Sequence, residues 1–274
     1  TSTIILVPGS GEVSRRNSQE GDGVNKYTTV IDLNFLLADI LCKEGFNVFL
    51  FDKRTCFLSR DISCNINYLK INKNIDFDDL ILDFDSVCEF LFSYLNENQK
   101  NKLIFFGFNQ STHVILNSKY KNYMSSIIII SPVVEKIDKV IVEGILENSF
   151  LSKSENMKYK MYNKSETVNS IFNAIKSGNF FLNSIIMGVT IEFWKKWFYE
   201  SSKSFELLNN LKIPSLFILV SDNKVLDKNS KNKIFKLNLN NKNKILFLNN
   251  VDHNLLTNEK LLYRNIFYIM RQYL

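Results

Sequence analysis

Short hydrophobic runs along this chain alternate with longer segments in which hydrophobic residues recur at helical spacing. The runs are too short for helices and lack polar alternation, which is typical of strands buried on both faces of a sheet. We therefore predict strands at residues 3–7, 46–51, 103–106, 127–130, 215–221 and 244–248. Helical spacing predicts helices at residues 32–43, 76–96, 229–239 and 258–273. Alternating strands and helices favour right-handed crossovers and a mostly parallel sheet of the α/β class.

The alternation stops between residues 133 and 212. Helix-like patterns occur here at residues 137–150, 166–176 and 185–198, and the last of these holds both tryptophans, Trp194 and Trp197. We predict a helical cap, residues 133–212, inserted into a core formed by residues 1–132 and 213–274. The cap aromatics either form an exposed apolar patch or seal the cap onto the sheet, and we favour sealing. Polar segments predict loops at 12–28 and at 57–74, the second with a short strand at 68–71.

The predicted strand at 103–106 runs into a helical segment through Gly107-Phe108-Asn109-Gln110-Ser111. A strand, a sharp turn and a helix with Gly107 at the joint resemble a nucleophile elbow, in which Gly-x-Ser-x-Gly lifts a serine above the carboxyl edge of a parallel sheet. Asn109 takes the position of that serine. A carboxamide has a delocalised nitrogen lone pair and no O–H for a base to deprotonate, so it cannot replace the serine. Asparagine tolerates positive φ, so Asn109 is compatible with keeping the turn while losing the chemistry.

Composition excludes several classes of protein. The 274 residues are 45% hydrophobic and 23% charged, close to globular averages, so disordered and fibrous classes are disfavoured. No hydrophobic run reaches the ~18 residues of a membrane span, and the first residues lack a signal-peptide pattern, so we expect a cytoplasmic protein. A net charge of +6 without a basic stripe argues against nucleic-acid binding. The four cysteines lack metal-binding spacing, so we expect reduced thiols, no metal and no cofactor.

Four short motifs, in order along the chain, resemble those of the α/β-hydrolases, particularly bacterial serine esterases and thioesterases. They are Val7-Pro8-Gly9-Ser10-Gly11 with Arg15 and Asn17, then Phe51-Asp52-Lys53-Arg54, then the elbow at 107–111, and finally Val251-Asp252-His253. The resemblance covers most of the chain outside the predicted cap. It implies an α/β-hydrolase fold and descent from an ester or thioester hydrolase.

The resemblance also implies a catalytic triad. In this family the triad follows the order nucleophile, acid, histidine, which places Asn109 at the nucleophile position and His253 at the general base. The acid would follow the strand at 215–221, where Asp222 is favoured over Asp227. The other histidine, His113, lies on the elbow helix, and we expect it to be structural.

The oxyanion hole of such enzymes is made by backbone N–H groups. The resemblance assigns it to Gln110 and to either Ser10 or Gly11. Backbone donors survive a change of side chain, so the site could still bind a carboxylate or carbonyl oxygen, with Arg15 adding positive charge. The Asp-Lys-Arg turn that contains Arg54 is mostly structural in relatives, so we expect Arg54 to tie loops together.

Three functional hypotheses remain open. In the first, a degenerate hydrolase binds a small acyl or carbonyl ligand, or a partner protein, without turning it over. In the second, an active hydrolase or lyase uses His253 as base while Asn109 and the backbone donors polarise the substrate. In the third, Asn109 is an engineered replacement of a native serine. The missing hydroxyl, and Ser111 at a position where the family has glycine, favour an inactive protein. A homodimer is compatible with all three.

Overall fold

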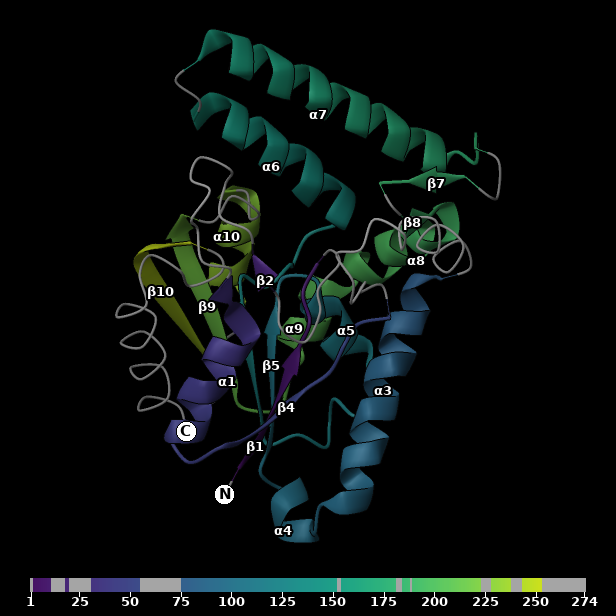
Figure 1. Cartoon of the computed structure of the whole chain (residues 1–274). Helices are drawn as coiled ribbons and strands as arrows, with labels where there is room; N and C mark the ends of the chain where they lie inside the picture. Colours follow the sequence, from purple (N-terminus) through teal and green to yellow (C-terminus); the bar gives the residue numbers. More distant parts are fainter. Residues whose placement is uncertain are drawn as a thin grey trace.

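The computed structural model describes residues 2–10, 18–19, 31–54, 75–151, 154–180, 184–187, 189–222, 228–237 and 243–252. Its centre is a six-stranded sheet with the strand order β10-β9-β6-β5-β1-β4. All neighbouring strands of this sheet run parallel, and helices lie against the sheet on both sides (Figure 1). The α/β class and the mostly parallel sheet predicted from the sequence are therefore confirmed.

Each predicted strand of the central sheet is present. The sheet contains β1 Thr3–Val7, β4 Asn47–Leu50, β5 Leu103–Phe108, β6 Ser126–Ile130, β9 Ser215–Asp222 and β10 Asn243–Asp252. Two antiparallel pairs of two-residue strands lie outside it. They are β2 Ser18–Gln19 with β3 Ile31–Asp32, and β7 Ile185–Ile186 with β8 Val189–Thr190.

Helices connect the strands as the hydrophobic spacing indicates. The first half of the chain contains α1 Leu33–Lys43, α3 Phe77–Tyr94, α4 Glu97–Lys100 and α5 Ser111–Asn117. The second half contains α6 Ile137–Leu151, α7 Glu155–Lys176, α8 Ile191–Ser202, α9 Ser204–Asn209 and α10 Lys228–Phe235. In Figure 1, α6 and α7 lie side by side across the top of the molecule.

The prediction of a helix at 185–198 was wrong in its first part. These residues form β7 and β8 before α8 begins at Ile191, and the Thr190 hydroxyl accepts a hydrogen bond from Phe193 N at 3.0 Å, which caps the new helix. The predicted helix at 166–176 begins earlier, at Glu155. The sequence did not indicate its first half, because the buried residues of α7 start only at Ser165 and the preceding turns have no hydrophobic stripe. Helix α9 was not predicted.

Some predicted elements lie outside the described residues. These are the loop at 57–74 with its strand at 68–71, and the last helix at 258–273. Of the predicted loop at 12–28, the structure describes only β2, which is a short strand.

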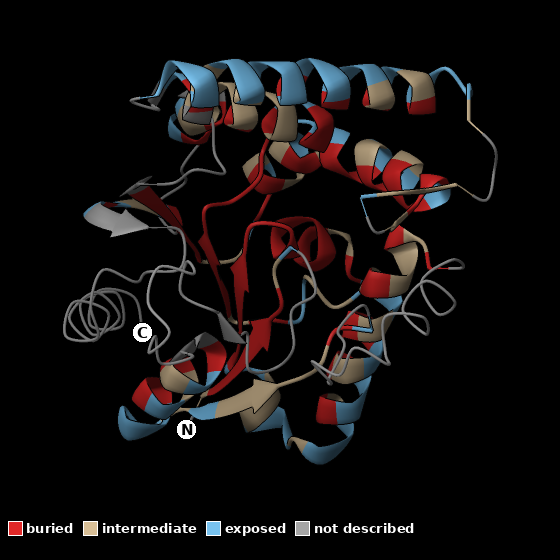
Figure 2. Ribbon diagram, turned by 45° about the horizontal axis from the view of Figure 1, so that its top comes forward, coloured by how far each residue is buried: buried red, intermediate tan, exposed pale blue. Residues whose placement is uncertain are grey.

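The two faces of the sheet carry separate hydrophobic cores. Ile4 and Leu6 of β1 pack with α1 on one face. Ile5 and Val7 belong to the core on the opposite face, to which α3, α5 and α8 contribute buried side chains. Successive residues of a strand alternate between faces, so a run of β-branched and aliphatic residues fills both cores at once. Figure 2 shows the buried strands at the centre of the molecule and exposed residues on the outer surfaces of the helices.

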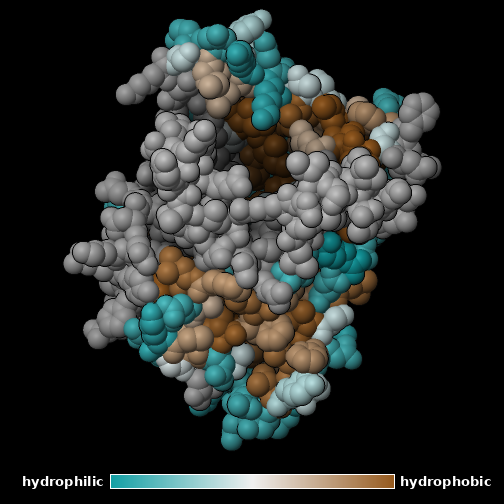
Figure 3. Space-filling model, in the orientation of Figure 1, coloured by the Kyte–Doolittle hydropathy of each residue, from teal (hydrophilic) through white to brown (hydrophobic). Residues whose placement is uncertain are grey.

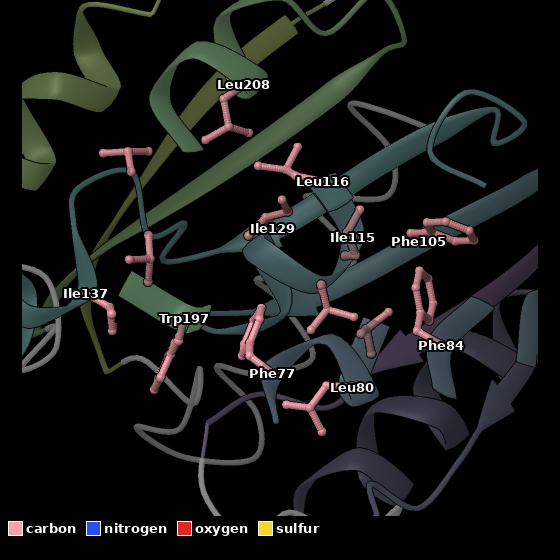
Figure 4. Packing of buried hydrophobic residues seen from close by; sticks show 14 of the residues in the cluster. Phe77, Leu80, Phe84, Phe105, Ile115, Leu116, Ile129, Ile137, Trp197 and Leu208 are labelled. Atoms are coloured by element: carbon pink, nitrogen blue, oxygen red, sulfur yellow. The ribbon is translucent and has the colours of Figure 1, made fainter. Parts of the chain in front are cut away.

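Ring contacts among Phe77, His113 and Trp197 join α3, α5 and α8, and Figure 4 shows Phe77 beside Trp197. Phe77, at the start of α3, stacks on Trp197 with ring centroids 5.6 Å apart and meets Phe193 edge-on at 5.6 Å. The two tryptophans are stacked on each other and are only 4% and 6% exposed. They seal α8 onto the core, and neither contributes an exposed apolar patch.

Candidate functional site

The carboxyl ends of the parallel strands meet at one edge of the sheet, where α/β proteins usually bind their ligands. Strand β1 leads there into Gly9 and Ser10, and β4 leads into Lys53. Strand β5 ends one residue before Asn109, and β9 ends at Asp222. The topology therefore brings the sequence-predicted residues Ser10, Asn109 and Asp222 to the same edge, together with Lys53.

Asn109 forms the sharp turn that the elbow motif predicts. Its φ is +46°, in the left-handed region, and helix α5 begins only two residues later. The backbone stays attached to the sheet through a hydrogen bond from Asn109 N to Ile130 O at 3.1 Å. Thr112 N donates to Asn109 O at 3.0 Å, which closes the first turn of the helix. A non-glycine residue held at positive φ is a strained conformation of the kind that clusters at active sites.

Gly107 and Ser111 touch each other across the inside of this elbow. A Cβ atom at position 107 would lie 2.2 Å from Ser111 Oγ and 2.9 Å from Ile115 Cδ1. The Ser111 hydroxyl is fully buried and donates a hydrogen bond to Phe108 O at 3.0 Å. Ser111 therefore points into the packing between strand and helix, where its hydroxyl cannot attack a ligand above the sheet edge.

Replacing Gly107 with alanine is expected to lower the free energy of unfolding by about 2 kcal/mol, because the added methyl group overlaps a packed helix. The double variant Gly107→Ala/Ser111→Gly should recover about half of this loss, since it removes the closer of the two contacts. Urea unfolding of the three proteins measures both effects. A loss below about 0.5 kcal/mol for Gly107→Ala would show that the elbow is looser than described.

Asn109 is 8% exposed, and its Oδ1 atom has no hydrogen-bond partner among the residues that the structure describes. Buried polar atoms are normally paired, because an unpaired one costs roughly 1–3 kcal/mol. The same carboxamide also carries two N–H donors, which can bind a carbonyl or carboxylate oxygen of a ligand. The residue in the nucleophile position is thus better suited to binding than to attack.

Lys53 joins the loop after β1 to the elbow. The side chain is 8% exposed, and its ammonium group donates to Gly9 O at 3.1 Å and to Gln110 Oε1 at 2.7 Å. Gly9 also packs directly on the elbow, since a Cβ atom there would lie 3.2 Å from Phe108 O. The two segments that carry the predicted oxyanion donors are therefore held together by one lysine and one close backbone contact.

The register of the last two strands brings the predicted acid close to the end of β10. Asp222 pairs with Asp252 in the parallel ladder, and the next residue in the sequence is His253. Only β6 lies between β5 and β9, so the elbow strand and the Asp222 strand are separated by roughly 10 Å. The triad of Asn109, Asp222 and His253 stays a prediction, since His253 lies outside the described residues.

Neither a protein-family model nor a curated protein sequence matches the chain. Solved structures do. One from work on the metagenome-derived lipolytic enzymes LipS and LipT has a TM-score of 0.60 at 11% identity, covering 99% of this chain and 94% of that one. A soluble variant of monoglyceride lipase from Saccharomyces cerevisiae gives 0.58 at 16% identity, with 99% and 86% covered. An esterase of Pyrococcus furiosus gives 0.55 at 15%, with 99% and 82% covered.

The chain has the α/β-hydrolase fold. The fold predicted from four short motifs is thus confirmed, although identities of this size show the fold alone and not an activity. Within the α/β-hydrolase fold, the described residues place Asn109 and Gln110 at the elbow, Ser10 on the neighbouring loop and Asp222 at the end of β9. Four other predicted site residues lie outside the described residues, namely Gly11, Arg15, Asp227 and His253.

His113 is a buried structural residue of this α/β-hydrolase fold. The imidazole is fully buried on α5, and its Nδ1 accepts a hydrogen bond from Trp197 Nε1 at 2.8 Å. Burial lowers the pKa of His113 to about 3, against a smaller opposing effect of the Val133 backbone. The ring is therefore neutral at physiological pH and faces the aromatic junction, which fits the structural role expected from the sequence.

Sequence reasoning assigned no role to Lys53, which lies in the same motif as Arg54. The guanidinium of Arg54 pairs with Asp83 and with Asp79, at 2.8 Å from Asp79 Oδ1, and the hydrogen bond to Asp83 is the main cause that raises its pKa. Arg54 thus ties its turn to α3, as expected. Lys53 turns inward instead, and the only signal in the sequence was its place directly after a strand of a parallel sheet.

The described residues also bear on metal binding and on membrane insertion. That part of the chain contains no group of three or more His, Cys, Asp or Glu side chains able to hold a metal ion. None of its helices is both long and apolar enough to cross a membrane. Of the described cysteines, Cys42 is exposed and Cys88 is buried, and both are free thiols.

Proposed function

We propose that this chain is a degenerate relative of ester or thioester hydrolases that binds a small acyl or carbonyl ligand without turning it over. The observation that carries the proposal is Asn109, which keeps the positive φ of a nucleophile elbow but presents a carboxamide where a hydroxyl would be needed for attack. The similarity to lipases and esterases supports the descent. The carboxamide supports binding without attack on carbon.

The oxyanion donors define the polar end of the proposed ligand. The backbone N–H of Gln110 is at the start of α5, and that of Ser10 or Gly11 is on the loop that Lys53 fastens to the elbow. Such donors bind a carboxylate or carbonyl oxygen even when no nucleophile is present. Arg15 would add positive charge at the rim.

The apolar end of the ligand would lie beneath the proposed cap, residues 133–212, which we assign as an insertion into the core formed by 1–132 and 213–274. Figure 3 shows a hollow below α7 whose visible walls are hydrophobic. Apolar walls with a few convergent polar groups are the usual composition of small-molecule sites. A medium-chain fatty acyl group therefore fits the proposal better than a sugar or a nucleotide.

A second candidate is an active hydrolase or lyase in which His253 is the base. The register that pairs Asp222 with Asp252 supports it, because Asp252 is the residue before His253 in the sequence. In this case Asn109 and the backbone donors would polarise the substrate carbonyl. A native serine at position 109, replaced in this chain, is a related alternative.

Octanoate and p-nitrophenyl octanoate test these proposals together. We expect octanoate to bind with micromolar to millimolar affinity by calorimetry, and p-nitrophenyl octanoate to give neither a burst nor turnover above buffer. A fluorophosphonate probe should leave the protein unlabelled, because the elbow position carries a carboxamide in place of a hydroxyl. Turnover by the chain as it stands would contradict the binding function and favour the second candidate.

A further inference from the structure

Lys53 is buried between two loops, unlike most lysines, which lie on the protein surface. Long charged side chains are rarely this buried unless their charged groups are paired. Two of the N–H donors of this ammonium group go to opposite sides of the proposed oxyanion hole, the Gly9 carbonyl and the Gln110 side chain. The same two segments carry the backbone N–H groups that would bind the ligand oxygen.

The hydrogen bond from Lys53 to Gly9 O also fixes the direction of the Ser10 N–H, because both groups belong to the same peptide unit. The Gly9 carbonyl and the Ser10 N–H belong to one peptide group, which is trans. In a planar trans peptide the two bonds point in opposite directions. When Lys53 holds the carbonyl on its own side, the Ser10 N–H must point away from Lys53. A charged donor on the carbonyl also polarises the peptide and makes the N–H a stronger donor.

The second bond acts on the other donor. Gln110 is 3% exposed, so its side chain has little freedom, and Lys53 fixes its amide oxygen at 2.7 Å. This charge-assisted bond ties Gln110 to the same ammonium group that holds the Gly9 carbonyl, so a movement of one segment relative to the other strains it. The short approach of Gly9 to Phe108 O keeps the two segments at a fixed separation.

We propose that Lys53 is a positioning residue that sets the direction and the spacing of the two oxyanion donors, Ser10 N–H and Gln110 N–H. The inference rests on the proposed function, because it assumes that these donors bind a ligand oxygen. It also selects Ser10 over Gly11 as the first donor, since only the Ser10 N–H shares a peptide with the carbonyl that Lys53 holds.

Arg54 provides a matched control. It is the neighbouring residue on the same turn and carries the same charge, but its guanidinium pairs with Asp79 and Asp83 on α3. Lys53→Met keeps the length and the apolar stem of the side chain and removes the ammonium group. Arg54→Gln removes a positive charge from the same turn without touching the elbow. Comparing the two variants separates local positioning from a general loss of charge.

The test uses backbone amide resonances of the free proteins and titration with octanoate. In Lys53→Met we expect the Ser10 and Gln110 amide signals to shift clearly and octanoate affinity to fall about tenfold. In Arg54→Gln we expect both signals to stay in place and the affinity to change less than about twofold. Unshifted Ser10 and Gln110 signals in Lys53→Met, or equal shifts in both variants, would overturn the inference.

The two proposals can fail separately. If the unmodified protein binds no octanoate, the proposed function fails, while the resonances of the free proteins still decide whether Lys53 orients the donors. In the variant Asn109→Ser, adding Lys53→Met should lower kcat for p-nitrophenyl octanoate about tenfold and leave KM nearly unchanged, because the donors act on charge that develops in the transition state. A change in KM alone would overturn the positioning role.

Discussion

Asn109→Ser is expected to give this chain measurable esterase activity, with p-nitrophenyl octanoate turnover at least roughly 100-fold above that of the unmodified chain. The elbow already holds residue 109 at a φ of +46°, so a serine there would present its hydroxyl at the sheet edge beside the backbone donors. The ladder pairs Asp222 with Asp252, and the triad prediction assigns the base to His253, the next residue in the sequence. Steady-state rates and fluorophosphonate labelling of residue 109 measure the gain.

Two controls make this prediction specific. Asn109→Ala has no hydroxyl and should be as inactive as the unmodified chain. His253→Ala in the Asn109→Ser background should abolish most of the gain, because a serine without its base is a weak nucleophile. Equal activity in the serine and alanine variants would place the reactive group elsewhere in the molecule.

Lowering the pH from 6.5 to 5 is expected to reduce the free energy of unfolding by about 2 kcal/mol through His113 alone. Burial lowers the pKa of this imidazole to about 3, whereas in the unfolded chain it titrates near 6.5. Below pH 6.5 the unfolded state binds a proton that the folded state does not, so stability falls by roughly 1.4 kcal/mol per pH unit until the folded-state pKa is reached. Above pH 6.5 both states are neutral and this contribution is fully present.

His113→Gln isolates the effect. An amide oxygen can still accept the Trp197 N–H but does not titrate in this range. Urea unfolding at several pH values between 5 and 7.5 should show a slope of about one proton less for the variant than for the unmodified chain. Identical slopes would mean that His113 is protonated in the folded protein. Measuring above pH 5 also keeps the titration of most carboxylates out of the comparison, because their pKa values are lower.

The central sheet could be predicted because its strands are short, uniformly hydrophobic runs without the spacing of hydrophobic residues that is typical of a surface helix. Strands β5 and β6 are buried on both faces, and a short apolar run between turn residues fits a buried strand better than other secondary structures. The segment before α8 was misjudged for the opposite reason. Its apolar residues fit a helix as well as two short strands, and only the positive φ of Met187 and the Thr190 cap in the structure decide between them.

Only those parts of the site that belong to short local motifs could be predicted from the sequence. The motif order located Asn109 and Gln110, because an elbow is local in sequence. It did not show that Lys53 would turn inward while Arg54 turned toward α3, since this depends on which partners lie opposite each side chain after folding. Acidic residues of α3 attract Arg54, whereas the Gly9 carbonyl and the Gln110 amide receive Lys53.

Both tryptophans of the chain lie in the aromatic junction of α3, α5 and α8, and one of them donates to His113. Intrinsic fluorescence is therefore a local probe rather than an average over the molecule. It will report loosening of the contact between α8 and the core, and it will be silent about fraying of the outer strand β4. A label placed near β4 would be needed to tell whether the two regions come apart in one step.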